Sequence, residues 1–312
     1  MKKFIQYIFI ALLLVGGFGY VHINRELNII NKNSLHCKPL TKTSNKTLAY
    51  KLKHKQSVNL LLFGVDTGAL NRHFKGRSDT IMLLSLNPKT NKSLLISIPR
   101  DTASYMPNQK QAGLAKLNTA YILGGPQMMA QVIQKQFNVP LDGYAVINMG
   151  GLEGLLKAVH GVRVKSNLTF SQDWYDFKKG HYYHLHGKKA LAYIRARHSD
   201  PLGDYGRQIR QRQVLKALTK KLMKPKVLLN TKVMRNVSKN VKSDITKQDL
   251  ITLGLYYSKS LKHMTTDHAQ GYAKDVYNMN YGLMEVEKMS KKERNRVTNK
   301  IKNHMTQQNR KK

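Results

Sequence analysis

The sequence predicts an α/β protein, an α-β-α sandwich with a mixed central β-sheet, preceded by one N-terminal transmembrane helix. Short apolar runs alternate along the chain with segments of helical spacing, which is typical of strands and helices packed in layers. Two neighbouring runs are joined by the turn-rich residues 87–92, which indicate a β-hairpin and therefore an antiparallel pair within the sheet. An uncharged stretch at the N-terminus supplies the transmembrane helix.

That N-terminal stretch, residues 4–23, is long enough to cross a hydrocarbon core of about 30 Å. Lys2 and Lys3 precede it, so the positive-inside rule places the N-terminus in the cytoplasm and the rest of the chain outside, on a single-pass anchor in the cell membrane. A cleaved signal peptide is the alternative, but the apolar run is long for one and no A-x-A-like site follows it. We therefore assign residues 1–24 to the cytoplasmic N-terminus and the anchor.

The remaining chain divides by composition. Residues 25–57 are polar and lack periodicity, which indicates an extracytoplasmic linker, and the main domain is expected over 58–262. The pattern predicts strands at 58–65, 80–86, 93–99, 143–148 and 162–164. It predicts helices at 116–123, 126–137, 152–159, 188–194, 206–223, 226–237 and 246–260. The basic segment 263–312 is expected to be a flexible C-terminal tail, because its end is almost free of aromatic residues.

The charge of the chain restricts its partners. The sequence holds 54 Lys and Arg against 17 Asp and Glu, a formal net charge of +37. Nucleic acid, an anionic membrane surface or an acidic extracellular polymer would each match this charge. An exported domain excludes genomic DNA, so we expect no nucleic acid partner. The single cysteine, Cys37, excludes an internal disulfide framework.

The predicted helix at 206–223 places polar groups where apolar ones are expected. Arg207 and Gln211 fall on the same side of this helix as Val214 and Leu218, and that side must face a core. A buried arginine needs a partner, which would be Asp204 or an anion carried by a ligand. Arg212, Lys216 and Lys220 fall on the opposite side, away from the core, and Arg210 lies between the two sides. Of these, Arg212 and Lys216 are predicted to be spectators.

Further charged residues stand at the predicted strand ends. Asp66 and Asp79 could hold a divalent cation such as Mg²⁺ together with phosphate oxygens, or could simply open and cap turns. Arg77 and Arg100 leave the sheet at ends where α/β proteins often place ligands, although surface positions are equally compatible with the spacing. Arg195 and Arg197, ahead of the Arg207 helix, add two more guanidinium groups. Converging planar groups of this kind suit phosphate or pyrophosphate.

Several segments together resemble the LytR-CpsA-Psr family of membrane-anchored cell-wall proteins of Gram-positive bacteria. The resemblance covers about half the chain and is carried by NLLLFGVD (59–66), GRSDTIMLLSLNP (76–88), LLISIPRDT (94–102), KLNTAYILGG (116–125) and LAYIRARHSDPLGDYGRQIRQRQVLKAL (191–218). It implies an enzyme that moves a phosphoglycosyl polymer, such as teichoic acid or capsular polysaccharide, from a polyprenyl-pyrophosphate carrier to peptidoglycan. It further implies Mg²⁺ on Asp66 and Asp79, and phosphate binding by Arg100, Arg195, Arg197, Arg207 and Gln211.

We therefore expect a phosphotransferase whose lipid tail lies in an apolar tunnel lined partly by the helix at 126–137. Asp79, Arg100 and Arg207 are expected to be catalytic, with Arg77 as an additional phosphate-binding residue, and Asp79, Asp101 and Asp204 are alternative general bases. Phosphoryl transfer relies mainly on positioning and electrostatics, which fits a site of Arg and Asp. The competing hypotheses are a non-catalytic receptor for anionic wall polymer, a nucleic-acid-binding transcriptional regulator, and a lipid pyrophosphate hydrolase.

Overall fold

A computed structural model of the protein describes residues 47–65, 76–222, 224, 227, 230, 232–233, 235–236 and 241–307. The expected membrane anchor, most of the expected linker and Asp66 lie outside these residues. Within the described part of the chain, no helix is both long and apolar enough to cross a membrane.

A mixed sheet of six strands forms the centre of the domain, in the order β11-β6-β1-β2-β3-β12. Its strands are β1 (Val58–Val65), β2 (Ser78–Asn87), β3 (Lys92–Ser97), β6 (Gly143–Asn148), β11 (Val241–Ser243) and β12 (Met264–His268). The expected hairpin joins β2 and β3, which pair antiparallel, whereas β6 pairs parallel with β1 and β12 parallel with β3. The predicted α/β fold with a mixed central sheet is therefore confirmed.

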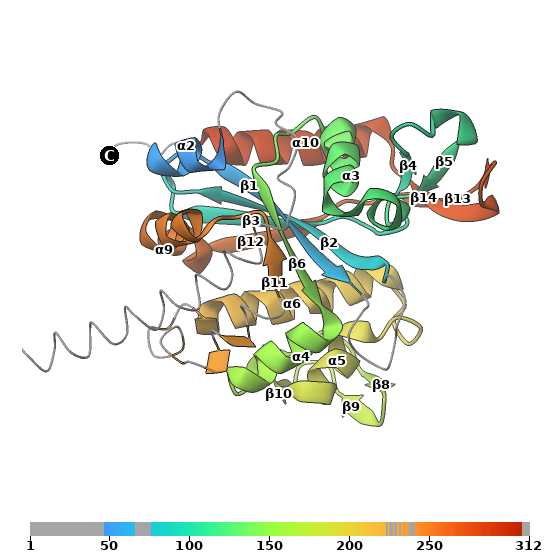
Figure 1. The fold of residues 1–312 in the computed structure, drawn as a ribbon. Coiled ribbons are helices and arrows are strands. Elements are labelled where there is room, and N and C mark those ends of the chain that lie inside the picture. The colour runs from blue at the N-terminus through green and yellow to red at the C-terminus, as the bar shows by residue number, and fades with distance from the viewer. Residues whose placement is uncertain are drawn as a thin grey trace, which may run out of the picture.

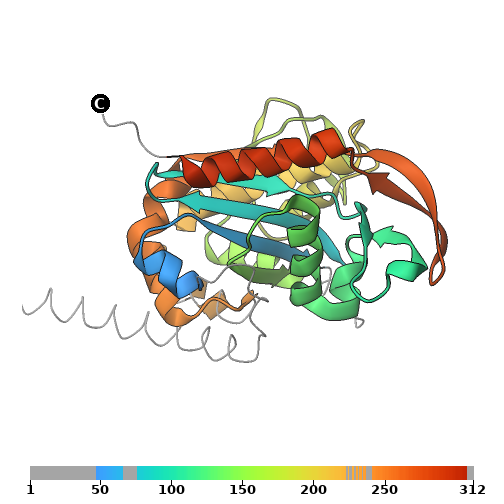
Figure 2. The ribbon, with the colours of Figure 1, turned by 90° about the horizontal axis from the view of Figure 1, so that it is seen from above.

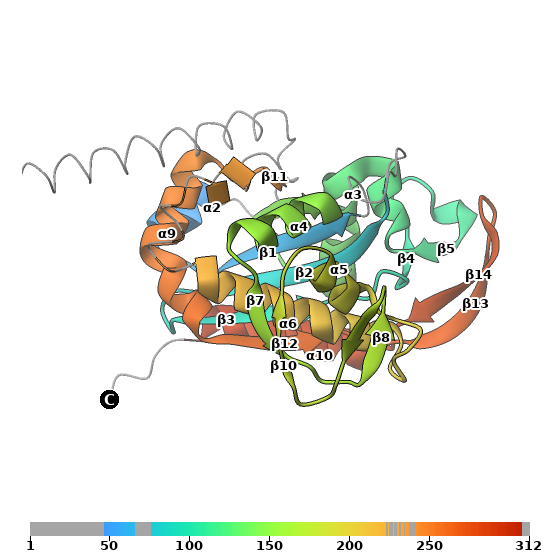
Figure 3. The ribbon, with the colours of Figure 1, turned by 90° about the horizontal axis from the view of Figure 1, so that it is seen from below.

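Helices cover both faces of this sheet (Figure 1). On one face lie α3 (Thr119–Phe137) and α10 (Lys291–Thr306), and Figure 2 shows α10 in red running along the strands. On the other face lie α4 (Met149–Ala158), α5 (Gly187–Arg195) and α6 (Asp204–Leu222) (Figure 3). The helices α2 (Leu48–Lys53) and α9 (Lys247–Lys262) pack together at one end of the domain.

The shorter elements lie outside the central sheet. They are β4 (Ala103–Tyr105), the 3₁₀ helix η1 (Lys110–Ala112), β5 (Leu114–Lys116), β7 (Val162–Lys165), β8 (Phe170–Gln172), β9 (Tyr175–Phe177), β10 (Tyr182–Leu185), β13 (Tyr272–Asn278) and β14 (Gly282–Lys288). The strands among them form two-stranded sheets, which pair β4 with β5, β7 with β10, β8 with β9, and β13 with β14.

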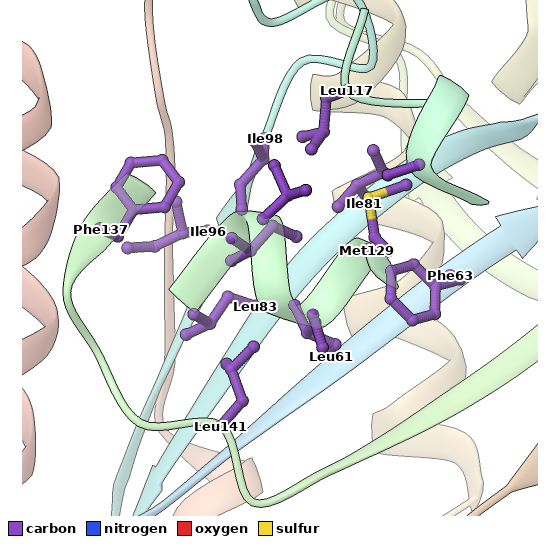
Figure 4. Packing of buried hydrophobic residues seen from close by; sticks show 14 of the residues in the cluster. Leu61, Phe63, Ile81, Leu83, Ile96, Ile98, Leu117, Met129, Phe137 and Leu141 are labelled. Carbon is purple, nitrogen blue, oxygen red and sulfur yellow. The ribbon is translucent and has the colours of Figure 1, made fainter. Parts of the chain in front are cut away.

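Successive side chains along the central strands point to opposite faces of the sheet, so the core is divided between these two faces. Leu61, Phe63 and Leu83 point to the face covered by α3 and α10, where they pack with residues such as Met129 (Figure 4). Their neighbours in sequence, such as Met82, face the opposite side. This period of two is the reason that β1 occupies the predicted residues 58–65.

The predicted break between two helices at Gly124 and Gly125 is present as a kink. Both glycines have non-helical backbone angles inside α3, and Gly125 has a φ of 62°, in the region that favours glycine. Pro126 restarts the helix directly after the kink. The turn before the kink therefore points in a different direction from the longer helical segment that packs on the sheet.

The expectation of a flexible tail over 263–312 is wrong for its described part. Strand β12 extends the central sheet, and Val297 and Ile301 of α10 are buried in the core. Few apolar residues suffice because α10 buries only one side and exposes its many lysines and arginines on the other. The end of the predicted linker also belongs to the domain, since Lys51 and Leu52 of α2 are buried.

Helix α10 buries a histidine, which predicts acid sensitivity. His304 is buried beside Ser85, with 3.0 Å between Nδ1 and Oγ, and burial lowers its pKa to about 4 from an ordinary 6.5. Between these pH values the unfolded chain binds a proton that folded His304 does not, so stability is complete above pH 6.5 and falls toward pH 4. We expect a loss of up to about 3 kcal/mol, measured by denaturant unfolding at a series of pH values.

In that experiment His304→Gln should flatten the pH dependence, whereas the same change at exposed His181 should leave it unaltered. An equally steep profile for His304→Gln would contradict the assignment.

Candidate functional site

An arginine-rich pocket of about 300 Å³ lies at one end of the sheet. It is lined by Asp79, Arg100, Met149, Gln172, Ile194, Arg195, Arg197, His198, Arg207 and Gln211. Six predicted site residues therefore meet here, from β2, the segment after β3, the end of α5 and the segment after it, and α6. Arg77 is exposed and is not among the lining residues, while Asp66 lies outside the described residues.

Helix α6 presents Arg207 and Gln211 as its pattern predicts. Both side chains are about 7% exposed, on the same side of the helix as buried Val214 and Leu218. Arg207 pairs with Asp204, one of the two partners expected from sequence, with 2.5 Å between Nη2 and Oδ1. Burial lowers the pKa of Arg207, and the nearby charges of Arg100 and Arg197 lower it further. An anion entering the pocket would relieve this repulsion.

Arg100 bridges two carboxylates at the edge of the pocket. Its Nη1 donates to Oδ1 of Asp79 at 2.6 Å, and its Nε lies 3.6 Å from Oδ2 of Asp101. Burial opposes the charge of Arg100, but Asp79 and Asp101 outweigh burial and raise its pKa. Asp101 also contacts Lys116, with 3.4 Å between the charged atoms. Asp79 is thus held in place as the single carboxylate among the residues that line the pocket.

Arg210, which the sequence leaves between the two sides of α6, is completely buried. It pairs with Asp200 and donates to the carbonyl oxygens of Tyr193 and Ala196. These contacts fasten α6 to the segment that carries the pocket residues Arg195 and Arg197. Arg210 therefore positions other arginines and does not itself line the pocket.

The expectation that Arg212 faces solvent is wrong, although Arg212 does not line the arginine pocket and its role as a spectator of transfer stays a prediction. Its side chain is buried, and burial lowers its pKa to about 10 against the opposing charge of Asp267. The reason is that β12 packs along the side of α6 that was expected to face solvent. Periodicity within one helix cannot show that a distant strand covers its polar face.

An apolar cavity of about 220 Å³ adjoins the arginine pocket. It lies between the sheet and α6, and residues such as Leu62, Met82 and Leu218 line it. Met149, Ile194 and Gln211 line both spaces. The helix at 126–137 does not contribute, contrary to expectation, because that part of α3 packs on the opposite face of the sheet. The two spaces together fit a ligand with an apolar part and an anionic part.

The chemistry of the pocket is compatible with Mg²⁺. Asp79 offers hard carboxylate oxygens, and Mg²⁺ commonly uses one or two carboxylates together with phosphate oxygens and water. The described residues contain no group of three or more His, Cys, Asp or Glu placed to hold a metal on their own. His184 and His186 approach each other with ring centroids 5.8 Å apart, at and just after β10, away from this pocket.

Three polar residues at or near the pocket were not identified from sequence. Gln172 and His198 line the pocket directly. Glu287 of β14 accepts a hydrogen bond from the N–H of Gly271 and contacts the hydroxyl of Tyr205, and burial raises its pKa to about 7, supported by the charges of Asp204 and Asp101. The amino-acid pattern does not predict β14 or the strand with which it pairs. The sequence therefore contains no signal that would place Glu287 beside α6.

Comparisons with known proteins identify a family model, a relative and solved structures that match this chain. A model of the LytR_cpsA_psr family matches residues 19–303. A relative from Enterococcus faecalis named polyisoprenyl-teichoic acid–peptidoglycan teichoic acid transferase TagU is 34% identical, covering 97% of this chain and 98% of the relative. The crystal structure of protein gbs0355 from Streptococcus agalactiae is 30% identical with a TM-score of 0.71, covering 87% and 93% of the two chains. A structure of TagT bound to LIIa-WTA is 25% identical with a TM-score of 0.62, covering 80% and 91%.

Proposed function

Because the chain belongs to the LytR-CpsA-Psr family, we propose that it transfers a phosphoglycosyl polymer of the teichoic acid class from a polyprenyl-pyrophosphate carrier to a sugar hydroxyl of peptidoglycan. The relative from Enterococcus faecalis is named as a teichoic acid–peptidoglycan transferase, and the match to it covers nearly the full length of both chains. The protein is therefore an enzyme of the glycopolymer–peptidoglycan phosphotransferase type.

The observation that carries the proposal is the junction between the two cavities. A polyprenyl pyrophosphate has an apolar chain and a doubly phosphorylated head, and the apolar cavity and the arginine pocket meet across Met149, Ile194 and Gln211. Burial of the lipid chain in the apolar cavity is favourable by about 25 cal/mol for each Å² of apolar surface removed from water. Four arginines favour the head by charge-assisted hydrogen bonds.

The proposed reaction exchanges one phosphorus–oxygen bond for another. A peptidoglycan hydroxyl attacks the phosphorus nearer the glycopolymer, the bond from that phosphorus to the bridging oxygen breaks, and polyprenyl phosphate leaves. The hydroxyl proton passes to a carboxylate near the pocket, for which Asp79, Asp101 and Asp204 are the candidates. Arg100, Arg195, Arg197 and Arg207 hold the phosphates in line and neutralise the charge that develops on the leaving group.

We also propose Mg²⁺ as cofactor, with Asp79 and Asp66 as its protein ligands. When bound, it would supply positive charge to the pyrophosphate oxygens. Asp79 would then remain next to Arg100, whose hydrogen bond fixes the carboxylate. The enzyme is further proposed to be anchored in the cell membrane by residues 4–23, with its catalytic domain outside the cell.

The test combines the purified full-length protein, a lipid-linked glycopolymer and peptidoglycan oligomers. We expect a phosphodiester-linked product that requires all three and that falls at least tenfold when EDTA removes divalent cations and returns when Mg²⁺ is added. Mass spectrometry of the product identifies the linkage. Binding without product would support a non-catalytic receptor, and release of glycopolymer phosphate without acceptor would indicate a hydrolase.

The location is tested separately by protease treatment of intact protoplasts. Digestion of the main domain supports the external location, whereas a protected domain would support the transcriptional regulator.

A further inference from the structure

A β-hairpin next to the arginine pocket carries the single tryptophan of the chain at its tip. Strands β8 and β9 pair antiparallel, and Asp173 and Trp174 form the two-residue turn between them. Trp174 is 103% exposed, the full extent that its side chain can offer to solvent. Figure 1 shows β8 and β9 beside α5, the helix whose C-terminal end carries Arg195.

The backbone of this turn is unfavourable for tryptophan. Asp173 and Trp174 have φ angles of 48° and 67°, in the left-handed region used by two-residue hairpin turns. Asp tolerates this conformation, and Gly is preferred at the second position, whereas a bulky side chain is a true outlier there. Within the described part of the chain, Trp174 has no aromatic or cationic partner. The folded domain therefore gains little from this side chain at this position.

The hairpin is joined to the arginine pocket through its polar residues. Gln172, two residues before Trp174, lines the pocket. Its Nε2 donates to Oδ1 of Asp173 at 2.8 Å, and Oδ2 of Asp173 lies 3.8 Å from Nη1 of the pocket residue Arg195. The turn is thus part of the rim of this site, and a group attached to a phosphate in the pocket comes within reach of it.

The base of the hairpin is rigid. Phe170 and Phe177 are buried and stacked, with ring centroids 4.7 Å apart. The guanidinium of Arg210 lies 4.9 Å from the ring centroid of Phe170, which connects the hairpin to the buried Arg210–Asp200 pair. A rigid support lets an exposed ring bind a ligand without losing much conformational freedom.

We propose that Trp174 is a carbohydrate-binding residue whose indole face packs against the sugar attached to the pyrophosphate of the donor. This inference rests on the proposed function. A pyranose ring has an apolar face of C–H groups that an indole covers well, while Gln172 and Asp173 are placed to bond its hydroxyls. The specificity of the site is thereby extended from the phosphates to the first sugar.

The charges around the turn favour a sugar over a membrane surface. Tryptophan also occurs at membrane interfaces, usually with basic neighbours that attract anionic lipids. Here Asp173 and Asp176 flank Trp174, in a chain that has only 17 acidic residues among 312. The half-exposed carboxylate of Asp173, in the turn itself, would be repelled by an anionic lipid surface and instead offers an acceptor to a sugar hydroxyl.

The single tryptophan makes the test direct, since the fluorescence of the full-length protein, excited where tyrosine does not absorb, reports on Trp174 alone. Two probes are compared in detergent: a polyprenyl pyrophosphate without sugar, and the same lipid pyrophosphate carrying a disaccharide. We expect a saturable change in fluorescence with the sugar-bearing probe and little or none with the sugar-free probe. Binding of both probes is measured independently by calorimetry.

Trp174→Gly is the informative variant, because glycine suits the backbone at this turn. This variant should keep or raise the melting temperature. Its affinity for the sugar-bearing probe should fall about tenfold, which corresponds to about 1.4 kcal/mol, and its affinity for the sugar-free probe should be unchanged. Trp174→Phe should restore part of the affinity. Tyr277→Ala removes another exposed aromatic residue, 70% exposed on β13, and should change neither affinity.

Five results would overturn the inference. Unchanged or equally weakened binding of both probes by Trp174→Gly would exclude a sugar contact. A fluorescence change with anionic vesicles in the absence of donor would assign Trp174 to the membrane, and a change with peptidoglycan oligomers alone would assign it to the acceptor. If the wild-type protein bound neither probe, both the proposed function and the role of Trp174 would fail. If it bound both probes in a manner that depends on Arg207, but without a sugar-dependent fluorescence change, only the role of Trp174 would fail.

Discussion

Arg207→Ala is expected to reduce glycopolymer transfer by at least a hundredfold while the protein remains folded. The side chain is buried and lines the arginine pocket, where its charge is screened little by water. Loss of one donor to a developing negative charge in such an environment typically costs a factor of 10² to 10³. The rate of phosphodiester formation at saturating donor measures this loss.

Arg207→Lys should not restore activity, because one ammonium group cannot pair with Asp204 and bind phosphate with the planar geometry of a guanidinium. Lys220→Ala, which removes a cation from an exposed position on the same helix, is the matched control and should retain transfer. Near-normal rates for Arg207→Ala would show that the phosphates bind elsewhere. An equal loss in Lys220→Ala would show that total charge matters more than position.

Gly206→Ala is expected to destabilise the domain by about 3 to 5 kcal/mol. A Cβ atom at this position would lie 1.8 Å from Oδ2 of Asp200, so the carboxylate must move. Asp200 is the partner of completely buried Arg210, and breaking a buried ion pair leaves an uncompensated charge in the interior. Denaturant unfolding should show a lower midpoint with an unchanged slope.

Gly254→Ala is the control for this substitution. Gly254 lies inside α9 with nothing within 4 Å of an added Cβ, so alanine there should stabilise the protein by about 0.5 to 1 kcal/mol. Asp200→Asn should also be destabilising, and adding Gly206→Ala to it should cost less than in the wild type because the two changes disrupt one interaction. Full additivity of the two changes would exclude the Asp200 contact as the cause.

The sequence predicts those parts of the fold and site that depend on local periodicity. Alternation in β1 and the turn-rich link after β2 determine the central strands and the hairpin. Helical spacing alone shows that Arg207 and Gln211 share the buried side of α6. The assignment of this site to pyrophosphate, in contrast, depends on the family resemblance.

Features that depend on distant contacts are not visible in the pattern. Arg212 is buried only because β12 covers it, and nothing within α6 indicates that strand. Glu287 contacts Tyr205 only because the fold places β14 beside the start of α6. The parallel partner of β12 is β3, far upstream in the chain, so the spacing of residues 264–268 gave no strand prediction.

The place of β12 has a consequence for the folding of the protein. Until residues 264–268 have paired with it, β3 forms an open edge of the central sheet, and α10, which follows β12 in the chain, does not yet shield the core beside α3. An unpaired strand edge is a template for association with other chains, and long-range parallel pairing is slow. The folding domain is therefore open to association with other chains until its last segments, β12 and α10, are in place.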